Sequence, residues 1–291
     1  MSSDRLAGHS RGRGLAEATA PRPGGPVVVE LIGIPGAGKT TLSREIVSLL
    51  RERGVEAGTV VGAARDHAAR TIPGRGLEHV HPARLRRALL WQLFYLLATA
   101  HALRFRREHR ALVRHVRGGQ RALPIPRRVR RHIRYWFFQL GGRYRLLTTT
   151  SDGGEALVFD DGFLHRSVHL HASHLEEPDA DRVRAYVDLV PVPDLVVVVA
   201  ASREVCEPRV RERGVWAHSR HMTGRELSMY LANAERVVDV AVGRARRRGW
   251  TVIEVGNGGR DLELVRSDLR EAMEAFPAIA AVPRIRTEAT R

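Results

Sequence analysis

The segment from Pro26 to Leu50 reads PVVVELIGIPGAGKTTLSREIVSLL and constrains the fold more than any other part of the chain. It begins with a nearly continuous apolar, β-branched run, which is typical of a strand buried on both faces of a parallel sheet. A glycine-rich turn follows, and beyond it Leu42, Ile46 and Leu49 recur at helical spacing until Gly54, where a helix would end. The segment therefore predicts a strand, a tight loop and a helix in direct succession.

The turn from Gly33 to Thr40 matches the phosphate-loop pattern G-x-x-x-x-G-K-[ST] at every fixed position. Glycines let backbone N–H groups converge on phosphate oxygens, and the start of the following helix favours an anion. We expect Lys39 to reach the β- and γ-phosphates of a nucleotide and the Thr40 hydroxyl to bind Mg²⁺. The residues expected around the phosphates are Gly33, Pro35, Gly36, Ala37, Gly38, Lys39, Thr40 and Thr41.

Lys39 is the only lysine among the 48 lysine and arginine residues of the chain. A compact ammonium group suits a phosphate-binding loop, so its position supports the phosphate-loop prediction. Because no second lysine exists, the Asn-Lys-x-Asp motif with which small GTPases recognise guanine is excluded. The single cysteine, Cys206, excludes an internal disulfide and favours a reducing compartment, so we expect a cytoplasmic protein.

The net charge of +16 is concentrated in one segment, Pro82–Thr150, which contains 17 arginines and one acidic residue, Glu108. Its patterning predicts helices, including an apolar run from Ala88 to Ala98 that is too short to span a bilayer. We expect this run to be a buried helix of an inserted bundle. The alternative is a helix in a membrane interface, with aromatic residues at the lipid boundary: Trp91, Phe94 and Tyr95. Arginines interleaved with aromatic residues could also bind nucleic acid.

A second strand pattern, Glu155–Asp161, ends in Asp160-Asp161-Gly162. Four apolar residues followed by an acid form a Walker B arrangement, so we expect Asp160 to hold Mg²⁺ opposite Thr40. Asp161 would position the nucleophile or have a structural role. His165 and His169 follow at a spacing that could bind a metal ion, although no further ligand motif accompanies them.

Asp66 follows the strand candidate Val55–Val61 and is expected in a loop or at the start of a helix. Ligands of open parallel sheets bind beyond the carboxyl ends of the strands, so Asp66 is a candidate general base toward an acceptor hydroxyl. The alternative is that it only caps a helix.

Further strand patterns at Asp194–Val199 and Trp250–Val255 alternate with helical segments. About five strands are expected in a doubly wound parallel sheet with helices on both faces. The expected organisation is a disordered tail (1–25), a core in two parts (26–81 and 151–276), an inserted arginine-rich helical subdomain (82–150) and a C-terminal tail (277–291).

The phosphate loop, Asp160-Asp161-Gly162, DLVVVVAASREVCEPRVRERG and TVIEVGN occur in an order that resembles the nucleoside and nucleotide kinases, including thymidylate-kinase-like proteins. The resemblance implies ATP- and Mg²⁺-dependent phosphoryl transfer to a small acceptor. By position, Arg209 and Arg213 match the arginines at the start of that family's mobile lid. Asn257 lies in the turn that matches the loop beside the adenine.

The sequence therefore predicts a kinase that moves the γ-phosphate of Mg-ATP to an anionic acceptor, such as a nucleotide, a phosphorylated sugar or a lipid-linked phosphate. One or more arginines would neutralise the charge that develops on the transferred group: Arg203, Arg209, Arg213 and Arg220. The alternative is an ATPase or ATP-gated binding module whose basic insertion engages nucleic acid or an anionic membrane.

Overall fold

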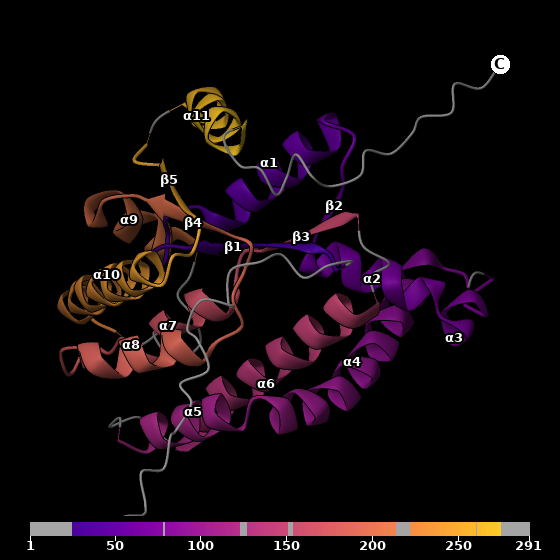
Figure 1. Ribbon diagram of the computed structural model, residues 1–291, viewed down its shortest axis with the longest axis horizontal. Coiled ribbons are helices and arrows are strands. Elements are labelled where there is room, and N and C mark those ends of the chain that lie inside the picture. The colour runs from indigo at the N-terminus through magenta and orange to yellow at the C-terminus, as the bar shows by residue number, and fades with distance from the viewer. Residues whose placement is uncertain are drawn as a thin grey trace, which may run out of the picture.

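The computed structural model describes residues 25–77, 79–122, 127–150, 154–213, 222–259 and 261–274. Within them, five parallel strands form one sheet in the order β2-β3-β1-β4-β5. The strands are β1 (Val27–Ile32), β2 (Glu56–Thr59), β3 (Glu155–Phe159), β4 (Leu195–Ala200) and β5 (Val252–Gly256). Helices lie on both faces of the sheet (Figure 1), so the predicted doubly wound α/β fold is confirmed. Apart from Gly25, the two expected tails lie outside the described residues.

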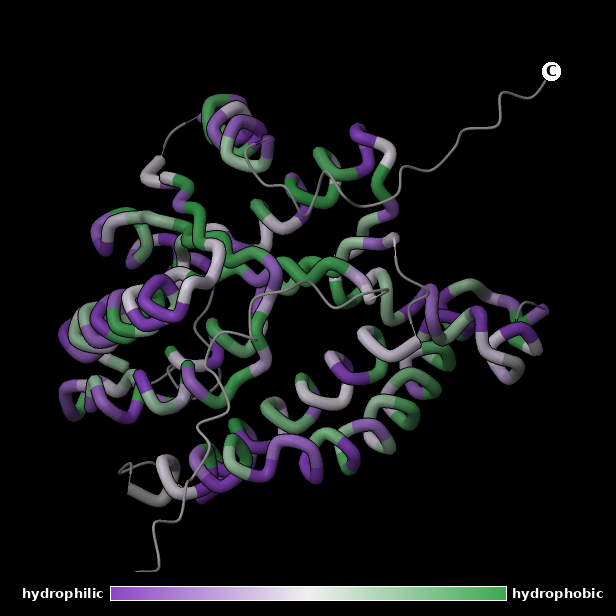
Figure 2. The backbone as a smooth tube through the Cα atoms, in the orientation of Figure 1, coloured by the Kyte–Doolittle hydropathy of each residue, from purple (hydrophilic) through white to green (hydrophobic). Residues whose placement is uncertain are grey.

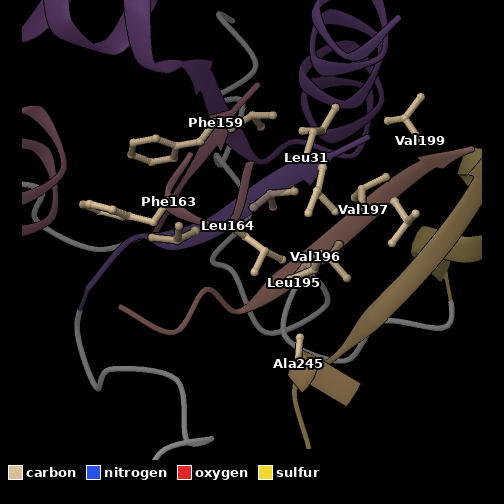
Figure 3. Close-up of a cluster of buried hydrophobic side chains, with 14 of the residues drawn as sticks. Leu31, Phe159, Phe163, Leu164, Leu195, Val196, Val197, Val199 and Ala245 are labelled. Carbon is tan, nitrogen blue, oxygen red and sulfur yellow. The ribbon is translucent and has the colours of Figure 1, made fainter. Parts of the chain in front are cut away.

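Strand β1 is the centre of the sheet, because β3 pairs with it on one side and β4 on the other. Val29, for example, is opposite Val158 in β3 and opposite Leu195 in β4. All three strands are buried on both faces, which explains their continuous apolar runs. Figure 3 shows their side chains meeting those of Phe163 and Leu164 in the core. The loops that follow the three strands therefore share one edge of the sheet.

The helices form two layers (Figure 1). One layer contains α1 (Lys39–Glu52) and α11 (Leu262–Glu274), and the other contains α7 (Phe163–His171), α8 (Ala180–Leu189) and α10 (Gly224–Arg247). Helix α9 (Arg203–Arg213) follows β4 and packs against α10. In Figure 2 the central strands are hydrophobic nearly throughout, whereas the helices alternate between hydrophobic and hydrophilic segments.

Strand β2 is shorter than the sequence pattern predicts, because helix α2 (Val60–Arg70) begins inside the expected strand. The Thr59 hydroxyl accepts a hydrogen bond from the backbone N–H of Gly62, which caps the start of α2. Asp66 therefore lies within a helix, neither in a loop nor at a helix start. A short helix, α3 (Ile72–Arg75), follows.

The connection from β2 to β3 contains α4 (Ala83–Glu108), α5 (Arg110–Ala122) and α6 (Arg127–Thr150). As expected, α4 has a buried face, which packs on α6 and α2. Phe94 lies on that face and is fully buried, so it cannot be at a lipid boundary as the interfacial alternative assumed. In the described part of the chain, we find no helix that combines the length and apolar character needed to cross a membrane.

The inserted helices share the core of the sheet. Phe163 at the start of α7 stacks on Phe105 of α4 at 5.3 Å between ring centroids, and it meets Phe137 and Tyr144 of α6 edge-on. All four rings belong to the same buried cluster as β1, β3 and β4. Packing of the insertion is thus coupled directly to the helix that follows β3.

Replacing Thr223 by alanine should lower the free energy of unfolding by about 1 kcal/mol. A capping box starts α10: the Thr223 hydroxyl accepts from the Glu226 N–H, and the Glu226 carboxylate accepts from the Thr223 N–H at 2.7 Å. Urea denaturation measures the effect. Thr223→Ser keeps the oxygen and should retain wild-type stability, and equal losses in both variants would contradict the capping explanation.

Candidate active site

The phosphate loop connects β1 to α1 through glycines that no larger residue could replace. Gly36 and Gly38 have φ angles of 88° and 94°, in the left-handed region that favours glycine. A Cβ at Gly36 would lie 2.6 Å from the carbonyl oxygen of Cys206, and one at Gly38 would lie 2.1 Å from Nδ2 of Asn257. The loop is thus wrapped closely by the segments that follow β4 and β5.

Lys39 is held in place by the loop itself. Its Nζ donates to the carbonyl oxygens of Gly33 at 2.9 Å and Ile34 at 3.0 Å. Burial lowers the pKa of Lys39 from 10.5 to about 8, although the nearby carboxylate of Asp161 opposes the shift. A phosphate beside this ammonium group would restore its pKa, so the site favours an anionic ligand.

Thr40 and Asp160 come together as the sequence predicts for a magnesium site. The Thr40 hydroxyl donates to Oδ2 of Asp160 at 2.9 Å, across 120 residues of chain. Hydroxyl and carboxylate oxygens are suitable ligands for Mg²⁺, which usually keeps several waters and takes further ligands from substrate phosphates. The donor set therefore fits a magnesium ion between the phosphate loop and the end of β3.

Asp161 lies next to Asp160 but in a different environment. Its Oδ2 accepts a hydrogen bond of 2.5 Å from Arg166 of α7. Burial raises the pKa of Asp161, while the charges of Arg166 and Lys39 counteract that rise. Oδ1 of Asp161 lies 4.0 Å from Nε2 of His169. Asp161 is thus a partly buried carboxylate with one oxygen directed toward a histidine.

Asp161, His165 and His169 have potential ligand atoms within 4.8 Å of one another, so they could hold a metal ion. Burial lowers the pKa of His165 well below its usual value, and the charge of Lys39 lowers it further. A neutral imidazole can bind a metal, but Lys39 and Arg166 already balance the negative charge of Asp161. These two cations disfavour a third cation at the same carboxylate.

Arg209 and Asn257 support the loop from the opposite side to Asp160. Nη1 of Arg209 donates to the carbonyl oxygens of Gly36 and Asn257, both at 3.4 Å. Nδ2 of Asn257 donates to the carbonyl oxygen of Ala37 at 2.7 Å. Both residues therefore lie against the loop, where the family resemblance implies nucleotide binding.

A cavity of about 350 Å³ opens over the phosphate loop. Its walls beyond the loop include Asp160, Asp161, His165, His169, Arg213 and Tyr230. Arg209 and Thr41 also line it, whereas Gly33, Ala37 and Asn257 contribute through the hydrogen bonds described above. Apart from Asp66, Arg203 and Arg220, the residues predicted for the site therefore meet around one cavity and its loop.

Asp66 does not line this cavity. It lies on α2 with its side chain 55% exposed, 3.6 Å from Arg65, and it lines a separate hollow between α2 and α4. Thr59 ends β2 and caps the start of α2, which directs Asp66 away from the phosphate loop.

The structure also does not place two of the predicted arginines at the cavity. Arg203 pairs with Glu235 at 3.0 Å and lies outside the cavity lining. Arg220 falls outside the described residues.

Glu30 is a polar residue of the site region that the sequence analysis missed. It lies in β1 and is 1% exposed, and its carboxylate accepts hydrogen bonds from the backbone N–H groups of Phe163 at 3.0 Å and Leu164 at 2.8 Å. A Cβ at Gly162 would come within 2.4 Å of this side chain. The only signal in the sequence is an acid within an otherwise apolar strand. Glu30 fixes the start of α7, the helix that carries His165 and His169.

Glu30 should make folding stability depend on pH. Burial raises its pKa from 4.5 to about 7, against the two backbone hydrogen bonds, so the folded protein binds this proton more tightly than the unfolded chain. The resulting stabilisation is complete below pH 4.5 and is lost as the pH rises to 7, by about 3 kcal/mol in total. Denaturation at several pH values measures it, and Glu30→Gln should abolish this part of the pH dependence. An unchanged profile in that variant would contradict the assignment.

Comparisons with known proteins place few limits on the function. No family model matches the chain, and no curated protein matches it. Among solved structures, the deoxyadenosine kinase from M. mycoides with bound dCTP is similar at 13% identity and a TM-score of 0.34, covering 86% of this chain and 100% of that chain. The same kinase with bound dATP has 12% identity, a TM-score of 0.40 and the same coverage. At this level of similarity, the function has to be inferred from the site itself.

Proposed function

We propose that the protein is an ATP-dependent phosphotransferase that moves the γ-phosphate of Mg-ATP to a small anionic acceptor. The observation that carries the proposal is the hydrogen bond between Thr40 and Asp160 at the mouth of the phosphate loop. This hydrogen bond brings together a hydroxyl and a carboxylate that are suitable ligands for Mg²⁺. Both lie beside Lys39, whose Nζ is positioned by the carbonyl oxygens of the loop. Thr40 and Asp160 would hold the ion, which would supply positive charge to neutralise the phosphates.

The chain itself would supply binding and positive charge on the donor side. Backbone N–H groups of the loop and the start of α1 bind the phosphates, and Lys39 contacts the β- and γ-phosphates. Arg209 of α9, which donates a hydrogen bond to the loop at Gly36, would contact the nucleotide. Arg213 at the cavity wall would stabilise charge on the transferred group. Asn257 would form part of the surface beside the adenine.

On the acceptor side, we assign to Asp161 the role of proton acceptor that the sequence analysis gave to Asp66. Asp161 lines the cavity, its pKa is raised by burial, and Arg166 orients it. A carboxylate in this position can accept the proton of an acceptor hydroxyl as the phosphoryl group is transferred. His165, which burial keeps neutral, and the neighbouring His169 would bind and orient the same acceptor. The positive lining, including Arg213, supports an anionic acceptor such as a nucleotide, a phosphorylated sugar or a lipid-linked phosphate.

Replacing Asp161 by asparagine should lower kcat by about 10²-fold, because the amide cannot accept the proton. In the wild type, activity should fall on the acid side with an apparent pKa above the usual 3.8 of aspartate, since burial raises it. Rates measured across pH in both proteins test this. If the rate of the asparagine variant fell at low pH in the same way as that of the wild type, another group would have to accept the proton.

The function is tested with ATP labelled at the γ-phosphate and a panel of phosphorylated sugars, nucleotides and lipid phosphates. We expect Mg²⁺-dependent transfer of the label to at least one acceptor. Release of the label only as free phosphate across the panel would instead favour an ATPase or an ATP-gated binding module. Failure to bind Mg-ATP at all would reject both functions.

A further inference from the structure

Helix α4 has apolar residues on two opposite faces. Leu90, Phe94 and Ala98 are buried against α6 and α2. On the other side, leucines recur four or seven residues apart and are exposed: Leu85, Leu89, Leu96 and Leu103. Leu96 is 70% exposed and Leu103 is 56% exposed. Exposed leucines that recur along one face of a helix form an apolar patch, which is a candidate docking surface.

The position of α4 leaves this stripe accessible. The helix lies at the outer edge of the molecule and packs with its inner face on α6 and α2 (Figure 1). Within the described residues, no other element covers the four leucines, and together they extend over about 27 Å of helix. The leucines therefore form a continuous row along the helix, unlike a single exposed apolar side chain, and such a row is typical of a docking face.

The charge around the stripe identifies the partner as anionic. Arg104 follows Leu103 of the stripe, and Arg107 continues the stripe one turn further; both arginines are exposed. The one acid of α4, Glu108, is held by Arg145 at 2.8 Å. The segment 82–150, which contains α4, carries the whole net charge of the chain. The leucines and arginines therefore lie together on a surface with no unpaired acid on α4 to balance them.

We propose that the outer face of α4 docks on an anionic membrane surface, with its leucines among the acyl chains and its arginines at the headgroups. Leucine beside arginine on one helix face is the composition of helices that lie in the plane of the interface. Long arginine side chains can reach the headgroups while their aliphatic stems stay with the leucines. Each arginine near an anionic leaflet adds about 1 kcal/mol of attraction. This surface association does not depend on the proposed phosphotransfer.

Two other partners fit the same surface less well. A second copy of the chain would place arginine ends against arginine ends in either helix orientation, with no acid on α4 free to compensate. A nucleic acid would pair with the arginines but leave the leucine stripe exposed. Only a surface that is both apolar and anionic satisfies both kinds of side chain.

The test is flotation of the full chain with vesicles of phosphatidylcholine alone or with about 30% phosphatidylglycerol. We expect binding only to the anionic vesicles, and Leu96→Gln with Leu103→Gln should weaken it at least about tenfold. The matched control is Leu262→Gln with Leu264→Gln on α11, where Leu264 is 54% exposed; it should bind as the wild type does. Circular dichroism establishes that both pairs remain folded.

Several results would overturn the proposal. One is failure of the wild type to bind anionic vesicles, and another is a stripe variant that binds as tightly as the control. A wild-type dimer that the stripe variant converts to a monomer, without vesicle binding by either, would assign the face to a second copy. Binding of RNA, but not vesicles, with no effect of the leucine changes would assign the arginines to nucleic acid.

Discussion

Replacing Lys39 by alanine is expected to lower kcat for phosphoryl transfer by about 10³-fold. Lys39 is the only lysine of the chain, and its Nζ is already positioned by the carbonyl oxygens of Gly33 and Ile34. It therefore needs no rearrangement to contact the β- and γ-phosphates. Loss of a preorganised charge next to the developing transition state removes stabilisation that water cannot replace.

The same substitution should not lower the stability of the fold. Burial lowers the pKa of Lys39 to about 8, which means that the folded state disfavours its charge at neutral pH. Removing a desolvated cation relieves that cost, so the melting temperature should not fall. Arg44→Ala is the matched control, because it removes one positive charge from an exposed position of the same helix. It should keep wild-type activity.

A further measurement separates the role of Lys39 in phosphate binding from a structural role. A bound phosphate should raise the lowered pKa of Lys39, so ATP binding near pH 8 should take up a proton. Calorimetry in buffers of different ionisation enthalpy detects this uptake, and Lys39→Ala should abolish it. If the alanine variant kept more than about a tenth of the wild-type kcat, the phosphate loop would not be the nucleotide site.

Replacing Asp160 by asparagine is expected to lower kcat by about 10²- to 10³-fold and to raise the Mg²⁺ concentration required for half-maximal rate. Asparagine keeps the shape of the side chain and an oxygen that can accept from the Thr40 hydroxyl, which Asp160 binds at 2.9 Å. It removes the negative charge that attracts the cation. The defect should therefore be one of metal binding, with the fold intact.

Asp161→Asn is the matched control for this prediction, since it alters the neighbouring carboxylate, which Arg166 binds. It should reduce the rate without changing the Mg²⁺ requirement. Manganese titration by electron paramagnetic resonance in the presence of ATP measures the metal affinity directly. Equal metal affinities in the Asp160 variant and the wild type would contradict the assignment of the ion to this carboxylate.

Local sequence patterns were sufficient to predict much of the fold and part of the candidate site. Apolar runs followed by a glycine-rich loop or an acid identified β1, the phosphate loop and β3, because buried parallel strands and phosphate-binding turns tolerate few other residues. The capping box of α10 is a local pattern of the same kind, because Thr223 and Glu226 interact within a single turn. The proximity of Thr40 to Asp160 followed from the Walker B pattern, in which an acid comes directly after a buried apolar strand.

The positions and contacts of residues that depend on packing between distant parts of the chain could not be predicted from the sequence. Asp66 was expected near the acceptor, but a cap formed by Thr59 starts α2 early and directs Asp66 elsewhere. Glu30 had no pattern to reveal it, because its partners are backbone groups of Phe163 and Leu164, more than a hundred residues away. The outward leucines of α4 could not be separated from its buried residues until the position of α6 was known.

The sequence by itself determined the parallel α/β core, the phosphate loop with its single lysine and the proximity of Thr40 to Asp160, since each depends on contacts within a motif or on the general geometry of parallel sheets. Only the tertiary structure decided which acids line the cavity over the phosphate loop and which side of α4 is exposed. Both depend on how α2, α4, α6 and α7 pack against one another. That packing arises from side-chain shape across long sequence separations, which local periodicity does not encode.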